Sequence, residues 1–385
     1  MPDRVKCLHA LAAHELAVPG ANPLGREAVL AAGDWWERPV RRTGPSSMSR
    51  TGTIRVAAID CGTNSLRLLI ADVDTQAGRL TDVDRRMEIV RLGQGVDATG
   101  RLAPKALART FRVLEGYANE ITSTSAACVR MVATSATRDA ANAAEFVGGV
   151  TRMLGVAPEV LSGAEEANLS FTGATAEFAS AKVEGPAEPP PSAAQRLGEP
   201  PPPPYLVVDI GGGSTEFVVG ADEPDAAHPV AALSVDIGCV RMTERHLHTD
   251  PPRPGEISAA TADIDAALDE VAAKVPVTGA RTLIGLAGSV TTLAGIALGL
   301  SAYDPSRTHH ATMSAARVHE MASDLLSQTH QQRAMIPVMH PGRVDVIGAG
   351  ALVLDRVMTR FGFGAVVVSE HDILDGIAWS LVTGR

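Results

Sequence analysis

Two segments of the sequence, about 150 residues apart, have the residue types of phosphate-binding turns. In each, a short apolar run ends in an aspartate, Asp60 or Asp209, and a turn rich in Gly, Ser and Thr precedes a second apolar run. Glycines let successive backbone N–H groups point into one concavity that holds phosphate oxygens, and hydroxyl groups add donors. The predicted phosphate-binding residues are Gly62, Thr63, Asn64 and Ser65 in the first turn and Gly211, Gly212, Gly213, Ser214 and Thr215 in the second.

Acidic residues beside these turns are candidate ligands of a divalent cation. Asp60 precedes the first turn, and Asp209 and Glu216 flank the second. Carboxylate oxygens suit Mg²⁺, a hard cation that keeps several waters and often shares its coordination with phosphate groups. We therefore predict Mg²⁺ as the cofactor, held directly or through water against bound phosphate.

A Ser-Gly-Ala-Glu-Glu segment that begins at Ser162 supplies another carboxylate. Ser162 and Glu165 have the spacing of a capping box, so Glu165 is expected to bond to a helix N-terminus. Glu166 is then free to face a cleft. It shares its helix face with Ser170 and Gly173, small residues that permit close approach of another element. Taken by itself, Glu166 is more readily interpreted as a solvated surface residue.

Two arginines and a third turn are further candidates for phosphate binding. Arg67 follows the first turn and Arg138 ends a Ser/Thr-rich segment, and the planar guanidinium group suits phosphate. A surface ion pair is the alternative for Arg138, and a solvent-facing strand position is the alternative for Arg67. Gly288 and Ser289 begin a strand-to-helix loop whose N–H groups could meet an anion, although helix capping explains them almost as well.

The spacing of apolar residues predicts the elements that position these groups. In the first half we expect the order βββαβαβα, with strands over 54–60, 66–73, 80–92, 127–133 and 158–161 and helices that begin at Pro104, near 140 and after Ser162. The order then restarts, with strands over 205–210, 215–220, 230–236, 282–286 and 365–369 and helices over 258–275, 314–328, 343–360 and 371–382. Two such α/β halves with facing turns would form a cleft, a common location of ligand sites.

Composition narrows the class of protein. With 385 residues, of which 45% are hydrophobic, the chain is long enough for two domains. A formal net charge of −10 disfavours nonspecific binding of nucleic acid. The four cysteines lack metal-ligand spacing, which is typical of reduced thiols in the cytoplasm. No stretch is apolar enough for a membrane span, so we expect neither a nucleic-acid nor a membrane partner.

The predicted domain organisation follows from these patterns. Residues 1–53 contain no strand-like run and are interpreted as a disordered leader, or as sequence that precedes the true start at Met48. Residues 54–184 form the first domain. Residues 185–204, with nine prolines, form an extended linker or insertion. Residues 205–385 form the second domain, and its final helix is placed so that it could pack on the first.

Four motifs, in order along the chain, resemble the exopolyphosphatase/guanosine pentaphosphate phosphohydrolase family. They lie at residues 58–67, 133–138, 162–167 and 209–216, and residues 286–292 and 343–351 are also similar to that family. The resemblance implies a duplicated actin-like ATPase fold, as in actin, Hsp70 and sugar kinases, of the ribonuclease H-like type with an interdomain cleft. It also implies that Glu166 orients or deprotonates the attacking water, and it makes a homodimer plausible.

The resemblance implies hydrolysis of the terminal phosphate of inorganic polyphosphate with release of orthophosphate. The main alternative is 5′-phosphohydrolysis of guanosine pentaphosphate (pppGpp), and the more distant ones are a kinase of the superfamily or a noncatalytic nucleotide-binding protein. Three departures from the family pattern bear on the substrate. The proline-rich stretch lengthens one connection, residues 369–376 lack an expected basic contact, and no helical HD-type domain follows the matched region, which favours short chains.

Overall fold

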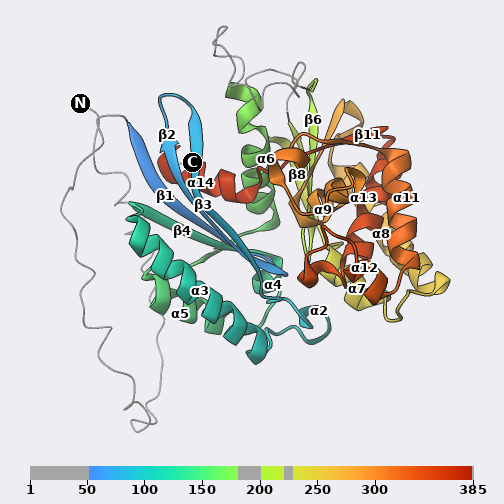
Figure 1. Cartoon of the computed structure of the whole chain (residues 1–385), viewed down its shortest axis with the longest axis horizontal. Helices are drawn as coiled ribbons and strands as arrows, with labels where there is room; N and C mark the ends of the chain where they lie inside the picture. The colour runs from blue at the N-terminus through green and yellow to red at the C-terminus, as the bar shows by residue number, and fades with distance from the viewer. Residues whose placement is uncertain (1–51, 181–200, 221–228, 384–385) are drawn as a thin grey trace.

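The computed structural model describes residues 52–180, 201–220 and 229–383, and these form two α/β halves (Figure 1). Two predicted segments fall largely outside the described residues. Residues 1–51 of the expected leader and residues 185–200 of the proline-rich stretch therefore remain sequence predictions. Within the described ranges, no helix combines the length and apolar character that a membrane crossing requires.

The first half is built on a five-stranded mixed sheet. Its strands are β1 (Thr53–Cys61), β2 (Ser65–Asp74), β3 (Arg79–Ile89), β4 (Cys128–Ala133) and β5 (Glu159–Val160), in the order β3-β2-β1-β4-β5. β2 is antiparallel to β1 and β3, whereas β4 is parallel to β1 and β5. Helices α3 (Pro104–Thr124) and α5 (Ala143–Leu154) cover one face, where Leu114 and Phe146 are fully buried (Figure 1).

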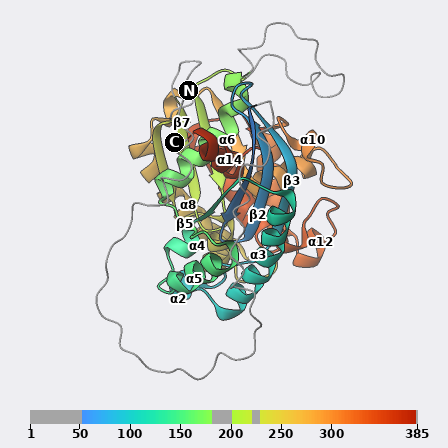
Figure 2. The ribbon, with the colours of Figure 1, turned by 90° about the vertical axis from the view of Figure 1, so that its left-hand side faces the viewer.

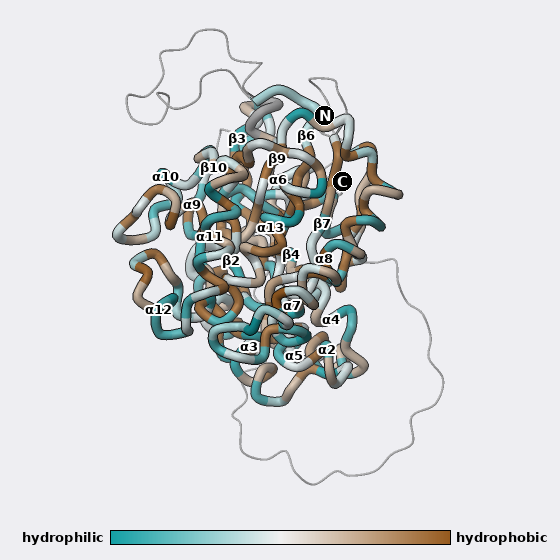
Figure 3. The backbone as a smooth tube through the Cα atoms, turned by 90° about the vertical axis from the view of Figure 1, so that its right-hand side faces the viewer, coloured by the Kyte–Doolittle hydropathy of each residue, from teal (hydrophilic) through white to brown (hydrophobic). Residues whose placement is uncertain are grey.

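The second half repeats this arrangement. The strands β6 (Tyr205–Ile210), β7 (Thr215–Gly220), β8 (Pro229–Val235), β9 (Thr282–Leu286) and β11 (Ala365–Val368) follow the same order, and β10 (Thr312–Ser314) adds one edge strand. The predicted duplication is therefore confirmed. One face is covered by α8 (Pro254–Lys274), α9 (Ala287–Ala297), α11 (Ala315–Ser327) and α13 (Ile347–Phe361). In Figure 3 hydrophobic and hydrophilic segments alternate along α11, as expected of a helix with one buried face.

Two helices lie between the sheets. Phe171 of α6 (Gly163–Ser180) packs on the second sheet, whereas Ile377 of α14 (Ile373–Thr383) packs on the first. The two helices run beside each other (Figure 2). They cross so closely that a Cβ added to Gly173 would lie 1.8 Å from the carbonyl oxygen of Asp372, and one added to Gly376 would lie 2.0 Å from that of Leu169. This crossing explains the small residues that follow Glu166.

The element boundaries differ from the sequence predictions where local bonds turn the chain. β3 ends at Ile89 rather than at 92, because the N–H groups of Val90 and Arg91 both donate to the carbonyl oxygen of Asn64. α8 begins at Pro254 rather than at 258, with a capping box formed by Glu256. The helices missed altogether are too short to show helical periodicity: α2 (Val96–Thr99), α4 (Ser135–Arg138), α7 (Cys239–His246), η1 (Val277–Gly279), α10 (Pro305–Thr308), α12 (His330–Ala334) and η2 (Pro341–Arg343). The three-residue edge strand β10 was also missed.

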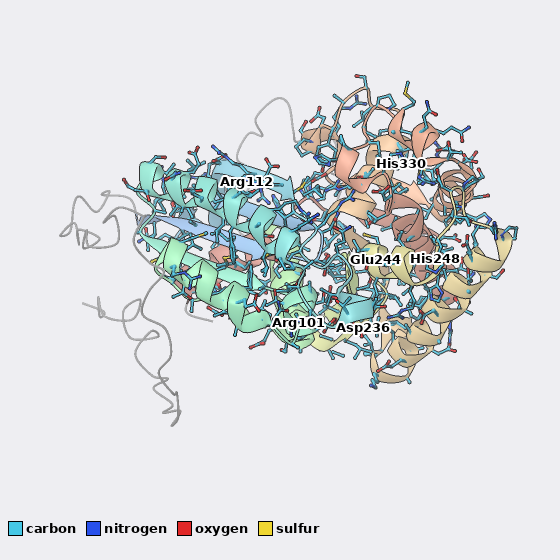
Figure 4. The ribbon with its side chains drawn as sticks, turned by 90° about the horizontal axis from the view of Figure 1, so that it is seen from below. Arg101, Arg112, Asp236, Glu244, His248 and His330 are labelled. Atoms are coloured by element: carbon cyan, nitrogen blue, oxygen red, sulfur yellow. The ribbon has the colours of Figure 1, made fainter. Side chains whose placement is uncertain are left out.

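Helix α7 joins the second half to the first. The Arg241 guanidinium donates to Asp97 at 2.6 Å, to Asp139 at 2.5 Å and to the carbonyl oxygen of Gly213 at 2.7 Å. Glu244 accepts the N–H of Gly95 at 3.1 Å, and Figure 4 shows this residue where the two halves meet. Because Gly213 belongs to the second turn, these bonds hold that turn against the first half of the molecule.

Candidate active site

The two predicted turns lie at one cavity between the halves, and they have the same internal geometry. Gly62 donates its N–H to the carbonyl oxygen of Ser65 at 3.0 Å, and Gly211 donates to that of Ser214 at 3.1 Å. The turn residues that line the cavity are Gly62, Thr63, Asn64, Ser65, Gly211, Gly212 and Ser214. The structure thus brings together most of the predicted phosphate-binding residues.

Gly213 and Thr215 do not line the cavity. A Cβ on Gly213 would lie 2.5 Å from the Ser135 hydroxyl and 2.7 Å from that of Thr63, so a side chain there would separate the two turns. Thr63 and Ser135 are themselves hydrogen-bonded at 2.9 Å. Thr215 instead donates its hydroxyl to the carbonyl oxygen of Ile237 at 3.1 Å. Both residues therefore fix the shape of the second turn rather than the chemistry of the cavity.

Three buried carboxylates line the cavity: Asp60, 3% exposed, Glu166, 8%, and Asp209, 7%. Asp60 and Asp209 are the next-to-last residues of the equivalent strands β1 and β6, and Glu166 lies in the first turn of α6. As predicted, the Ser162 hydroxyl and the Glu165 carboxylate form the capping box of this helix. Asp209 accepts the hydroxyl hydrogen of Ser170 at 2.7 Å.

Glu216 lies apart from the cavity. It pairs with Asp209 across the β6–β7 hairpin, is buried, and accepts a hydrogen bond from the Ser234 hydroxyl at 2.7 Å. The predicted cation ligands therefore divide into two that line the cavity and one that lies beside Asp209 on the next strand.

Arg67 lines the cavity, but its positive charge is already balanced by ion pairs with two carboxylates. Its Nε and Nη2 donate to Asp60 Oδ2 at 3.0 and 2.8 Å, and its Nη1 donates to Asp372, which precedes α14. The alternative of a solvent-facing strand residue is thus wrong, because the carboxylates on both sides keep the side chain largely buried. The final helix supplies this contact through tertiary packing.

Arg138 is not among the residues that line the cavity, so its predicted contact with phosphate stays a prediction. It donates to the carbonyl oxygen of Leu161 at 2.9 Å and to Glu166 Oε2 at 3.3 Å. The Ser/Thr-rich segment folds into the single turn of α4, which ends at Arg138. Its ion pair is with a buried carboxylate rather than with a surface one.

Gly288, Ser289 and Arg343 complete the wall opposite. The first two lie in the first turn of α9, where free N–H groups and the helix dipole favour an anion. Arg343 was not predicted as a site residue, and its only signal in the sequence is its place in a familial segment. Its Nη1 donates to the Thr292 hydroxyl at 2.9 Å, and burial lowers its pKa. No carboxylate among the described residues forms an ion pair with it.

Comparison with known protein families identifies the family and the fold. The model of the Ppx/GppA phosphatase family matches residues 69–185 and 199–383. The chain belongs to this family. The match covers most of both halves, including Glu166, the second turn and the crossing of α6 with α14, and it begins just after the first turn. A separate family of proteins of unknown function (DUF501) matches residues 1–30, outside the described residues.

Individual relatives of this Ppx/GppA phosphatase carry two kinds of name. Exopolyphosphatase 2 of Mycobacterium tuberculosis is 48% identical over 85% of the chain and 98% of its own length. The guanosine-5′-triphosphate,3′-diphosphate pyrophosphatase of Aeromonas salmonicida is 27% identical over 85% of the chain and 59% of its own length.

Solved structures agree with the observed architecture. The crystal structure of an exopolyphosphatase-like protein superposes over 85% of the chain and 97% of that protein's own length, with a TM-score of 0.76 and 41% identity. The Ppx/GppA protein of Aquifex aeolicus covers 86% and 98%, with a TM-score of 0.67 and 28% identity. The phosphatase thus has the predicted duplicated α/β fold of the actin-like ATPase type, and it is a hydrolase of phosphoric anhydrides.

The carboxylates of the phosphatase raise one another's pKa. Burial raises the pKa of Asp209 to about 6, and the charges of Asp372 and Asp60 act in the same direction. Burial and the charge of Asp209 raise the pKa of Glu216 to about 8. Burial, followed by Glu216 and Asp60, raises the pKa of Glu166 well above its ordinary value. Such a cluster favours bound protons or a bound cation.

The predicted cation site fits the structure in part. Among the described residues, no three side chains of His, Cys, Asp or Glu converge as metal ligands, so Asp60, Asp209 and Glu216 do not form a complete cage. Asp60 nevertheless has one buried oxygen, Oδ1, without a hydrogen-bond partner, beside a cavity that Asp209 also lines. Two carboxylates plus water and substrate oxygens is an arrangement that Mg²⁺ accepts.

The raised pKa of Glu216 predicts that the stability of the protein depends on pH. In metal-free protein, the free energy of unfolding should fall as the pH rises from about 4.5 to about 8, because Glu216 keeps its proton over that interval when folded and loses it when unfolded. The variant Glu216→Gln should show a shallower dependence. Chemical denaturation in EDTA at about pH 5 and about pH 8 measures it. Glu115→Gln, on the exposed side of α3, is the control, and equal slopes for wild type and Glu216→Gln would contradict the assignment.

Proposed function

We propose that this phosphatase is an exopolyphosphatase that transfers the terminal phosphoryl group of short inorganic polyphosphate to water. The observation that carries the proposal is the position of Glu166. Its carboxylate lines the same cavity as two matched phosphate-binding turns, and its raised pKa suits a group that takes up a proton near neutral pH. The relative that is 48% identical and named an exopolyphosphatase supports the choice of substrate.

Different residues around the cavity would have different roles in hydrolysis. The turns and the N-terminus of α9 would hold the terminal phosphate through N–H and hydroxyl donors, and Arg343 would add positive charge where the transferred group carries negative charge. Glu166 would accept a proton from the attacking water. As the new P–O bond forms, the bond to the bridging oxygen breaks, which releases orthophosphate and a polyphosphate shortened by one unit.

The charges of the cavity support a requirement for a divalent cation. Three acidic side chains and two guanidinium groups line it, so a polyanion meets carboxyl groups as well as positive charge. We propose Mg²⁺ held by Asp60 and Asp209, with Glu216 beside Asp209 on the neighbouring strand β7. When bound, the cation would offset the charge of the phosphate oxygens and of the carboxylates.

The second candidate substrate is guanosine pentaphosphate. The specific observation in its favour is the Aeromonas relative, whose name describes a guanosine-5′-triphosphate,3′-diphosphate pyrophosphatase. Both substrates present a terminal phosphate to the same turns, so they differ only in what extends out of the cavity.

A phosphate-release assay distinguishes the candidates. Tripolyphosphate, long-chain polyphosphate, guanosine pentaphosphate and ATP would be compared at equal concentrations, each with Mg²⁺ and with EDTA. We expect kcat/KM to be highest for tripolyphosphate, lower for the long chain, and lost in EDTA. A preference for guanosine pentaphosphate would favour the second candidate, and phosphoryl transfer from ATP to a sugar would refute hydrolysis as the function.

A further inference from the structure

The two arginines of the cavity differ in how their charge is used. Arg67 is bonded to Asp60 and Asp372, so its positive charge is balanced within the protein. Arg343 forms no ion pair with any described carboxylate, and its Nη1 instead donates to the neutral hydroxyl of Thr292. Arg343 therefore brings an uncompensated positive charge to the cavity wall, and its orientation depends on neutral groups.

Helix α9 provides those neutral groups at two positions one turn apart. The Thr292 hydroxyl donates to the carbonyl oxygen of Gly288 at 2.6 Å, which leaves its oxygen lone pairs directed to Arg343. A Cβ on Gly288 would lie 2.3 Å from Arg343 Nη2 and 2.4 Å from its Cζ. The guanidinium thus lies against the bare backbone of Gly288, a place that any other residue would block.

Glu370, an acid whose charge acts on Arg343, is bonded to other groups. Glu370 is close enough for its charge to raise the pKa of Arg343, but it forms no ion pair with it. Its carboxylate instead accepts the Tyr303 hydroxyl hydrogen at 2.6 Å and that of Thr308. These bonds satisfy Glu370 without the arginine and leave the guanidinium available to a substrate.

We infer that Gly288 and Thr292 form a seat on α9 that orients Arg343 toward the terminal phosphate, which makes Thr292 a positioning residue. The inference rests on the proposed function. A donor that is fixed before the substrate arrives loses less conformational freedom on binding than a mobile one. Gly288, predicted from the sequence to bind phosphate through its N–H, thereby acquires a second role.

Kinetics of Thr292→Val test the inference, because valine keeps the shape of the side chain and removes the hydroxyl. We expect KM for tripolyphosphate to rise about tenfold, with a smaller change in kcat, since the seat acts on a contact present in the ground state and the transition state. Gly288→Ala should change KM in the same direction. Thr292→Ser, which keeps the hydroxyl, should restore KM. Thr282→Val, which removes a buried hydroxyl bonded to Pro202 elsewhere in the same half, is the matched control.

A double-mutant cycle separates positioning from a direct or merely structural role. In an Arg343→Met background, Thr292→Val should have no further effect, because the group it positions is gone. An equal change of KM in both backgrounds, or an unchanged KM in Thr292→Val and Gly288→Ala, would overturn the inference. If the wild-type protein shows no turnover, only the proposed function is refuted. Calorimetric binding of tripolyphosphate to the same variants then still tests whether Gly288 and Thr292 orient Arg343. If Thr292→Val does not fold, Gly288→Ala decides the cycle.

Discussion

Replacement of Glu166 by glutamine should lower kcat for phosphate release by roughly 10²- to 10⁴-fold, the usual contribution of a general base. The carboxamide has nearly the same shape, but it cannot accept a proton from water. The wall of the cavity is otherwise unchanged, so binding of tripolyphosphate should persist. Phosphate release in Mg²⁺ and calorimetric binding measure the two effects separately.

Glu165→Gln is the matched control for this substitution. Glu165 is the preceding residue and is exposed, and its carboxylate bonds to the N–H and hydroxyl of Ser162 rather than facing the cavity. Its loss should weaken the helix cap slightly and leave turnover near that of wild type. Undiminished turnover in Glu166→Gln would show that another group activates the water. Equal losses in both variants would show that the helix start, rather than the carboxylate, matters.

The parts of the site that could be predicted from sequence are those formed within one short segment. A glycine-rich turn after a buried strand has a local geometry, so the two turns and their aspartates were found from spacing alone. The repeat of strand, turn and strand also revealed the duplication, since the same local signals specify both halves. The capping of α6 by Ser162 and Glu165 followed from spacing for the same reason.

The residues and bonds that were missed depend on contacts between distant segments. Arg343 lies more than 50 residues after Ser289 and reaches the cavity only because α13 packs against α9 and the Arg343 side chain bonds to Thr292. The contact of Arg138 with Glu166 was missed because it joins α4 to α6, 28 residues further along the chain. The partner of Arg67 is Asp372, which joins the site only when α14 returns to the first sheet. Local spacing contains none of this information.

Replacement of Gly173 by alanine should destabilise the protein by about 3 kcal/mol or more. The added Cβ would lie 1.8 Å from the carbonyl oxygen of Asp372, and a backbone atom cannot move aside as a flexible side chain can. Overpacking of a buried contact typically costs about 1–3 kcal/mol, and a clash with backbone lies at the upper end or beyond. Urea denaturation of wild type and variant in the same buffer measures the difference.

Gly116→Ala gives the matched control, because Gly116 is also helical but exposed, and no atom lies within 4 Å of its added Cβ. That substitution should stabilise the protein by roughly 0.5–1 kcal/mol, the difference in helix propensity. Equal urea midpoints for wild type and Gly173→Ala would show that α6 and α14 can separate at little cost.

The crossing also connects stability to chemistry, because α6 carries Glu166 and Ser170 and the start of α14 follows Asp372, the partner of Arg67. Helices forced apart at Gly173 would displace the base from the phosphate-binding turns, so we expect Gly173→Ala to lose turnover even at temperatures where it remains folded.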